Sequence, residues 1–139
     1  MQCYDTIVIG GGPAGATAAE TLVKRGRSVL LIDRRGRIKP CGGAIPPRLI
    51  QDFDIPDHLL ACKVKAARMI SPSNRSVDML IDGGFVGMVD RDIFDEWLRE
   101  RAVSAGATRT DGTVVTIDRD TQGGYRVGYR EKEGDGDIR

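Results

Sequence analysis

A glycine cluster between two short apolar runs constrains the fold of this chain more than any other feature. The cluster, residues 10–15, reads Gly-Gly-Gly-Pro-Ala-Gly and fits the pattern G-x-G-x-x-G. Residues 6–9 before it and 28–32 after it are continuous apolar runs, typical of parallel strands buried on both faces. The segment between them has apolar side chains near helical spacing, an early proline and Gly26 after its end. The sequence therefore predicts a βαβ unit.

Each part of this turn has a role in binding the diphosphate of a dinucleotide. In the pattern, Gly10 permits the tight turn, Gly12 lets the pyrophosphate approach and Gly15 lets the helix pack against the strand. The helix that starts after Gly12 offers unpaired N–H groups and its positive dipole end. Asp33 follows the second run, where its carboxylate can accept ribose hydroxyls. The expected dinucleotide site comprises Gly10, Gly12, Pro13, Ala14, Gly15 and Asp33; the alternative is a structural turn.

The residues alone leave the identity of the dinucleotide open. Asp33 suits either NAD or FAD, because both carry an unmodified adenosine ribose. Arg34 and Arg35 follow it and could contact the 2′-phosphate of NADP, or could lie in a solvated loop.

Composition excludes several classes of function. Charged residues make up 29% of the chain but nearly cancel to a net charge of +1, so we expect no nucleic acid partner. Three cysteines without a C-x-x-C pair suit a reducing cytosol and predict no metal site. The apolar runs are too short to span a membrane, and the first run begins too early for a signal or transit peptide. These features favour a cytoplasmic protein.

The remaining segments predict an α/β fold of Rossmann type with a small antiparallel insertion. Residues 34–47 are rich in Arg, Gly and Pro, which predicts a loop. Residues 64–70, 77–81 and 85–89 are strand-like and separated by turn signals, so we expect them to form a small antiparallel β-meander.

A helix and a hairpin are expected after the meander. Asp90 is a plausible N-cap for a helix to about Ala105, with one inward face: Ile93, Phe94, Trp97, Leu98, Ala102 and Ala105. Residues 113–117 and 125–130 resemble a hairpin around Gln122.

The helix region carries a resemblance to a known family. Residues 90–98, Asp-Arg-Asp-Ile-Phe-Asp-Glu-Trp-Leu, followed by Ala-Gly-Ala at 105–107, resemble the second conserved segment of the glutathione-reductase-like flavoproteins. These include aromatic hydroxylases and geranylgeranyl reductases. The resemblance implies FAD as the bound cofactor, with Arg91 beside the flavin and the strand near Val115 presenting its backbone to adenine. The alternative for Arg91 is a surface arginine at the start of the helix, without a role in cofactor binding.

A second segment narrows the resemblance within that family. Residues 39–47, Lys-Pro-Cys-Gly-Gly-Ala-Ile-Pro-Pro, are similar to the P-C-G-G segment of geranylgeranyl reductases of chlorophyll and bacteriochlorophyll synthesis, and residues 83–91 agree. The resemblance implies that Cys41, Gly42 and Gly43 lie along the isoalloxazine ring, with Cys41 as the candidate catalytic residue. Two glycines allow close backbone approach, and sulfur is polarizable. From the residues alone, an inert buried Cys41 is the favoured reading.

The implied function is reduction of a geranylgeranyl group to phytyl, on the free diphosphate or on a pigment, with NADPH as hydride donor. A hydrophobic substrate implies a peripheral contact with a photosynthetic membrane. Residues 1–130 would then be the N-terminal portion of the FAD-binding domain and 131–139 a charged, frayed tail. The substrate domain would lie outside this chain. Two alternatives are an FAD-dependent monooxygenase or halogenase, and a truncated nucleotide-binding fragment without catalytic activity.

Overall fold

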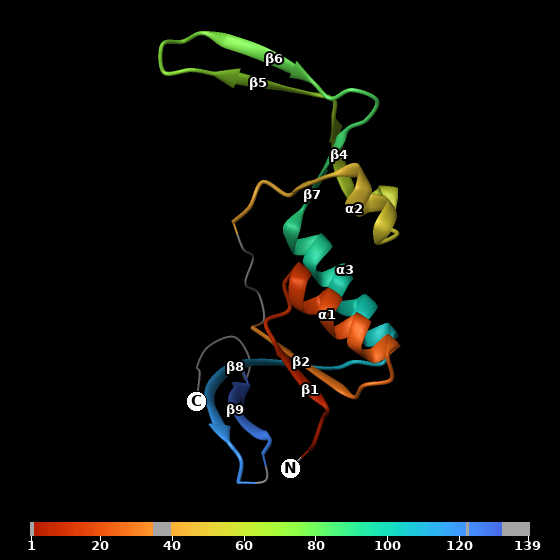
Figure 1. The fold of residues 1–139 in the computed structure, drawn as a ribbon, viewed down its shortest axis with the longest axis vertical. Helices are drawn as coiled ribbons and strands as arrows, with labels where there is room; N and C mark the ends of the chain where they lie inside the picture. Colours follow the sequence, from red (N-terminus) through yellow and green to blue (C-terminus); the bar gives the residue numbers. More distant parts are fainter. Residues whose placement is uncertain (1, 35–39, 122, 132–139) are drawn as a thin grey trace. The chain divides into compact units, whose positions relative to one another are not determined.

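The structure is a computed structural model that describes residues 2–34, 40–121 and 123–131. The chain forms two compact units (Figure 1). The first unit comprises Met1–Arg37 and Asp95–Arg139, and the second comprises Ile38–Phe94. The expected α/β fold with inserted antiparallel strands is confirmed.

The glycine cluster folds as the predicted βαβ unit. Strand β1 (Thr6–Ile9) leads into helix α1 (Pro13–Lys24), and strand β2 (Val29–Asp33) returns parallel to β1. Gly26, at φ +78°, ends the helix and donates its N–H to Val23 O at 2.8 Å. The two apolar runs thus pair as neighbours in one parallel sheet.

The sheet of the first unit has the strand order β1-β2-β8-β9. The first part of β8 (Thr108–Arg119) pairs parallel with β2, and its remainder pairs antiparallel with β9 (Tyr125–Glu131). The predicted hairpin is therefore confirmed, with longer strands than expected. Glu131 was expected in the tail but ends β9 opposite Gly112. Arg35, Lys39, Gln122 and residues 132–139 lie outside the described residues.

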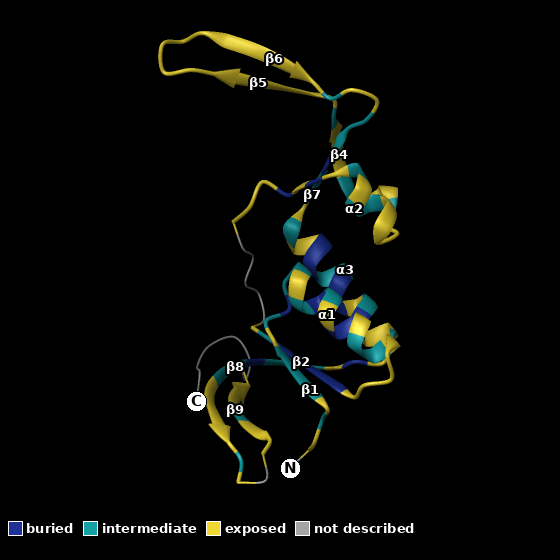
Figure 2. Cartoon of the chain, in the orientation of Figure 1, coloured by how far each residue is buried: buried dark blue, intermediate teal, exposed yellow. Residues whose placement is uncertain are grey.

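Burial differs between the two parallel strands. Strand β2 is largely buried, as expected, whereas β1 is mostly of intermediate burial (Figure 2). Val29 and Leu31 of β2 are fully buried, and Ile9 of β1 is 49% exposed. The prediction that β1 is buried on both faces is therefore wrong. The physical reason is that β1 pairs only with β2 among the described strands, so it forms an edge of the sheet.

Helix α3 (Arg91–Ser104) begins after Asp90, whose carbonyl accepts the N–H of Phe94 at 2.8 Å. Its buried positions are Phe94, Asp95, Leu98, Arg99 and Ala102. The expected face was correct for Phe94, Leu98 and Ala102 but wrong for Ile93, which is 58% exposed. The stripe at Asp95, Leu98, Arg99 and Ala102 follows i, i+3, i+4, i+7 spacing, so two charged residues occupy the packed face of the helix.

Helices α1 and α3 pack together against the sheet (Figure 1). Ala19 of α1 and Ala102 of α3 are fully buried beside Leu31. An ion-pair cluster also joins the helices: Glu20 accepts hydrogen bonds from Arg101 Nε at 2.8 Å and from Lys24 Nζ at 2.6 Å. Burial alone would raise the pKa of Glu20, but these hydrogen bonds hold it below its ordinary value.

The second unit begins with short elements and contains five strands among its described residues. It comprises β3 (Ala44–Ile45), α2 (Pro47–Asp52), a 3₁₀ turn η1 (Asp57–Leu59), β4 (Leu60–Val64), β5 (Ala66–Ile70), β6 (Ser76–Leu80) and β7 (Val86–Val89). Strand β3, helix α2 and strand β4 were not predicted, and β3 lies within residues 34–47, which were expected to form a loop. No described helix has the length and apolar character needed to cross a membrane.

The antiparallel strands pair differently from a meander. Strands β5 and β6 form an exposed two-stranded ribbon, whereas β7 lies between β3 and β4 (Figure 2). The Ile81 N–H donates to Lys65 O at 2.9 Å at the base of the ribbon, and Gly83, at φ +65°, turns the chain after it. A Cβ on Gly87 would lie 2.9 Å from Leu60 Cδ2 and 3.1 Å from Ile50 Cδ1. Strand β7 is therefore seated closely against β4 and α2.

Candidate functional site

Gly10 and Gly15 of the cluster have backbone reasons to be glycine. Gly10 has φ +102° and donates its N–H to Ile32 O at 2.8 Å, so it turns the chain out of β1. A Cβ on Gly15 would lie 1.8 Å from the carbonyl oxygen of Gly10. Helix α1 can therefore lie this close to the turn only because Gly15 has no side chain.

Gly12 is in a different situation, because a Cβ added there would meet no atom within 4 Å. It is the N-cap of α1, with Pro13 as the first helical residue and no side-chain capping bond. Its carbonyl accepts the N–H of Ala16 at 2.9 Å, while the N–H groups of Ala14 and Gly15 precede Ala16, the first intrahelical donor. Open space and aligned donors at a helix N-terminus fit the diphosphate of a dinucleotide.

Asp33 lies at the end of β2 with its side chain 20% exposed, and the next residue, Arg34, is exposed. Its Oδ2 accepts a hydrogen bond from Arg99 Nε at 3.2 Å, and the same Nε donates to Gly11 O at 2.9 Å. A Cβ on Gly11 would lie 2.8 Å from Asp33 Oδ2 and 3.0 Å from Arg99 Nε. Gly11, a variable position in the glycine pattern, is therefore confined by both side chains.

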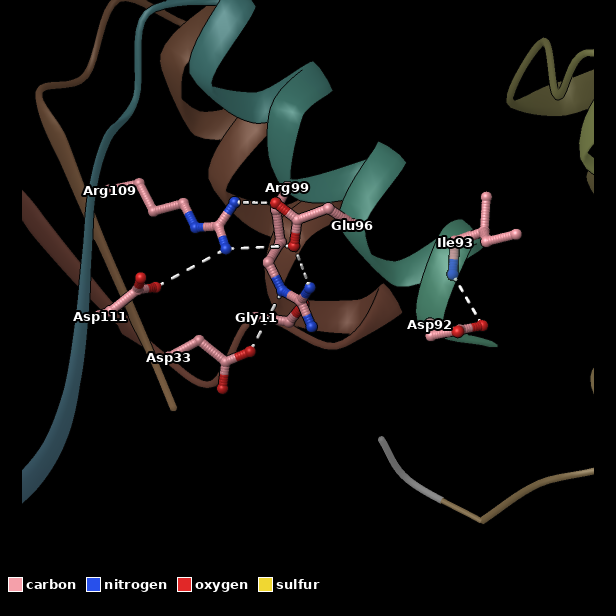
Figure 3. Close-up of polar contacts among 8 residues, drawn as sticks. All are labelled: Gly11, Asp33, Asp92, Ile93, Glu96, Arg99, Arg109 and Asp111. Atoms are coloured by element: carbon pink, nitrogen blue, oxygen red, sulfur yellow. Dashed lines mark hydrogen bonds and ion pairs between the residues drawn. The ribbon is translucent and has the colours of Figure 1, made fainter. Parts of the chain in front are cut away.

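Arg99 is one member of a charge network that runs behind Asp33 (Figure 3). Arg99 Nη1 donates to Glu96 Oε2 at 2.6 Å, and Arg109 donates to both oxygens of Glu96. Arg109 Nη2 also lies 3.6 Å from Asp111 Oδ1. We call this set of alternating charges the Arg99 network: Asp33, Arg99, Glu96, Arg109 and Asp111.

The network changes the acidity of Glu96. The hydrogen bond from Arg109, supported by that from Arg99, holds the pKa of Glu96 below its ordinary value despite partial burial. A depressed folded-state pKa contributes stability above the ordinary value of about 4.3, and this stability is lost as pH falls through the folded-state pKa.

We therefore expect wild type to be more stable than Glu96→Gln at pH 7 by about 1 kcal/mol, a figure discounted for solvent screening. The difference should shrink as pH falls below about 4.3 and through the lower folded-state pKa, because Glu96 is then protonated and, like the glutamine, neutral. Urea unfolding of both proteins at pH 7, 4 and 3 measures it. Glu100→Gln, an exposed glutamate on the same helix, controls for the loss of one helix charge. A gap between wild type and Glu96→Gln that does not change with pH would contradict the prediction.

The loop that contains Cys41, residues 40–43, lies in the second unit. Cys41 is exposed, and a Cβ on Gly42 would meet no atom within 4 Å. Gly43, at φ +67°, accepts the Val89 N–H at 2.9 Å, and a Cβ there would lie 2.1 Å from Val89 O. Gly43 thus anchors the loop on β7, while Cys41 and Gly42 remain accessible. The inert buried reading of Cys41 is not supported, because the side chain is exposed.

The other two predicted positions are Val115 and Arg91. Val115 is exposed and lies where the β8–β9 register shifts between Val114 and Thr116. A register irregularity of this kind leaves backbone groups outside the regular ladder, which suits a strand that presents its backbone to a ligand. Arg91 is half-buried at the first position of α3.

The predicted site residues are divided between the two units. The first unit contains Gly10, Gly12, Pro13, Ala14, Gly15, Asp33, Arg34 and Val115, and the second contains Cys41, Gly42, Gly43 and Arg91. Within the first unit the structure joins the glycine turn to Asp33 through Arg99. Arg99 was missed from sequence, although the i, i+3 spacing of Glu96 and Arg99 was a detectable signal.

Relatives of this chain agree with the resemblance seen in its motifs. The geranylgeranyl diphosphate reductase of Rhodobacter capsulatus is 63% identical over 129 residues, which cover 93% of this chain and 33% of the relative. The geranylgeranyl diphosphate reductase of a Synechocystis species is 44% identical over 115 residues, covering 80% of this chain and 28% of the relative. This chain therefore spans about a third of the length of these relatives.

Solved structures show the same fold. A geranylgeranyl bacteriochlorophyll reductase-like protein of Thermoplasma acidophilum superposes with a TM-score of 0.78 at 27% identity, covering 97% of this chain and 36% of that one. The flavin-dependent brominase Bmp2 superposes with a TM-score of 0.73 at 25% identity, covering 97% and 35%.

The family assignment rests on the segment that contains the whole glycine cluster and Asp33. Residues 8–80 match the model of the NAD(P)-binding Rossmann-like domain, and this match covers more than half of the chain. The homology to geranylgeranyl diphosphate reductases confirms the resemblance expected from the motifs. The chain belongs to the family of NAD(P)-binding Rossmann-like domains.

Proposed function

We propose that this chain is the FAD-binding part of a flavin-dependent geranylgeranyl reductase. The observation that carries the proposal is the 63% identity to the Rhodobacter capsulatus reductase over 93% of the chain. The brominase has nearly the same fold but only 25% identity, which favours the reductase over the halogenase alternative. Its flavin dependence supports a flavin as the cofactor.

Residues of the first unit would hold the ADP half of FAD. Gly12 leaves open space for the diphosphate, and the N–H groups of Ala14 and Gly15 face it from the start of α1. The Asp33 carboxylate would accept the ribose hydroxyls, Arg34 would lie beside them, and the backbone at Val115 would contact adenine. Gly10 and Gly15 act indirectly, because they set the turn and the approach of the helix.

Residues of the second unit would meet the flavin ring. Cys41 and Gly42 are accessible on a loop that Gly43 anchors to β7, so their backbone and the small sulfur can lie along a flat ring. Arg91 would lie beside the flavin. The bound flavin supplies the hydride-transfer chemistry, and the protein supplies binding and orientation.

The proposed reaction saturates double bonds of a geranylgeranyl group, present as the free diphosphate or on a pigment. Each double bond takes up a hydride, with NADPH as its source, and a proton, so NADP⁺ and a saturated carbon pair are formed. Segments outside this chain would bind the substrate. We further propose a cytoplasmic protein whose hydrophobic substrate brings it to the surface of a photosynthetic membrane.

Titration of the purified chain with FAD tests the cofactor assignment. We expect saturable binding, competed by ADP but not by FMN, because the first unit recognises the ADP half. Flavin fluorescence reports binding, and circular dichroism verifies the fold. A folded chain that binds no FAD would contradict the assignment and leave a fragment without cofactor.

The reductase assignment needs the full-length protein that contains this chain. We expect NADPH-dependent conversion of geranylgeranyl diphosphate to more saturated products, measured by mass spectrometry. Halogenation of an aromatic acceptor with oxygen and bromide, in place of alkene reduction, would establish the halogenase alternative.

A further inference from the structure

Arg99 is a buried cation that the nucleotide-binding pattern does not include. Its side chain is 11% exposed, and it comes from α3, which is distant in sequence from the glycine turn. A buried guanidinium is costly unless its N–H groups are paired and its charge is balanced. The Glu96 carboxylate, 2.6 Å from Arg99 Nη1, balances this charge and lowers the free-energy cost of burying it. The Nε of Arg99 is directed at Asp33 and Gly11.

We propose that Arg99 is a positioning residue that fixes the Asp33 carboxylate for the adenosine ribose and ties it to the phosphate-binding turn. This inference rests on the proposed dinucleotide site. The Nε contacts Asp33 Oδ2 at 3.2 Å and Gly11 O at 2.9 Å. One donor thus joins the end of β2 to the turn after β1, and Asp33 Oδ1 is the oxygen that we assign to the ribose.

The local packing supports a positioning role. Gly11, Asp33 and Arg99 meet so closely that a Cβ on Gly11 would displace the Asp33 carboxylate or the Arg99 guanidinium. A carboxylate held by a fixed donor loses less rotational freedom when a ligand binds, so preorganisation strengthens its hydrogen bonds to the ribose. Arg109, which hydrogen-bonds Glu96, keeps that carboxylate in place behind Arg99.

The test compares FAD with its 2′-deoxyadenosine analogue, using the full chain. A hydrogen bond to a charged carboxylate predicts that wild type binds FAD about tenfold or more tightly than the analogue. In Arg99→Met, Asp33 is no longer held in place. We therefore expect FAD affinity to fall about tenfold and the ratio of FAD affinity to analogue affinity to approach one. A purely structural role for Arg99 would weaken both ligands equally and leave their ratio unchanged.

Matched variants separate positioning from folding. Arg101→Met removes another arginine of α3, one that binds Glu20 of α1, so it should preserve the preference for FAD. Arg99→Lys keeps the charge but loses the guanidinium geometry, so it should also lower the preference for FAD over the analogue. This variant provides the test if Arg99→Met does not fold.

The outcomes are distinguishable. A folded wild-type chain that binds no FAD overturns the proposed site and the role of Arg99 together. Wild type that binds FAD and the analogue equally, or Arg99 variants that keep the wild-type ratio, overturn the role of Arg99 while FAD binding stands.

Discussion

Replacement of Gly15 by alanine is expected to destabilise the first unit by about 3 kcal/mol or more. Alanine is favoured over glycine in a helix by about 1 kcal/mol, and the unfolded chain loses a little entropy, so both local effects favour the variant. Packing decides against it, because the new Cβ would lie 1.8 Å from the Gly10 carbonyl oxygen. That oxygen belongs to the backbone, so α1 must move away from the sheet.

Thermal unfolding of Gly15→Ala, followed by circular dichroism, should show a midpoint lowered by roughly 10 °C or more. Gly12→Ala is the matched control, since it lies in the same motif and its Cβ meets no atom within 4 Å. Its stability should stay within about 1 kcal/mol of wild type. Equal midpoints for the two variants would show that helix α1 does not depend on the close approach at Gly15.

Local sequence signals were sufficient for the βαβ unit and for the ends of α3. Continuous apolar runs identify β1 and β2, because strands of a parallel sheet need no polar alternation. Gly26 and Gly106 mark helix ends, and both adopt positive φ. Each of these signals depends only on residues that are close together in sequence, so the sequence alone is enough to detect it.

Local sequence signals did not predict which strands pair or which side chains are buried. Alternation indicates that residues 85–89 form a strand, but it does not say that β7 lies between β3 and β4. The inward face of α3 was likewise judged from apolar residues, which selected Ile93 and omitted Arg99. Arg99 is buried because it pairs with Asp33, 66 positions away in sequence, and helical periodicity does not report such a pairing.

The candidate site also contains residues that local sequence signals identify and residues that only tertiary contacts reveal. Gly10, Gly12, Gly15 and Asp33 were found from spacing, because each satisfies a backbone or ligand requirement that the pattern encodes. Gly11 occupies a variable position of that pattern, yet a Cβ there would displace the side chain of Asp33 or Arg99. The requirement at Gly11 arises from tertiary contacts, so it became visible only in the structure.

Replacement of Gly12 by valine is expected to lower FAD affinity at least 100-fold, about 2.7 kcal/mol, while the chain stays folded. The structure separates the effect on binding from the effect on folding, because a Cβ on Gly12 would meet no atom of the described residues within 4 Å, apart from its own chain neighbours. The space that a valine side chain would fill is the space that we assign to the diphosphate, and its bulk would also screen the N–H groups at the start of α1.

Fluorescence titration with FAD measures the loss, and circular dichroism verifies that the variant is folded. Gly124→Val is the matched control, since its Cβ also meets no atom within 4 Å but it lies in the β8–β9 hairpin, away from the turn. It should bind FAD as wild type does. Wild-type affinity in a folded Gly12→Val would mean that the diphosphate does not occupy the glycine turn. A loss that also lowered the unfolding midpoint as far as Gly15→Ala does would assign Gly12 to folding instead. The pair Gly12 and Gly15 thus separates the ligand requirement of the motif from its packing requirement within one turn of helix.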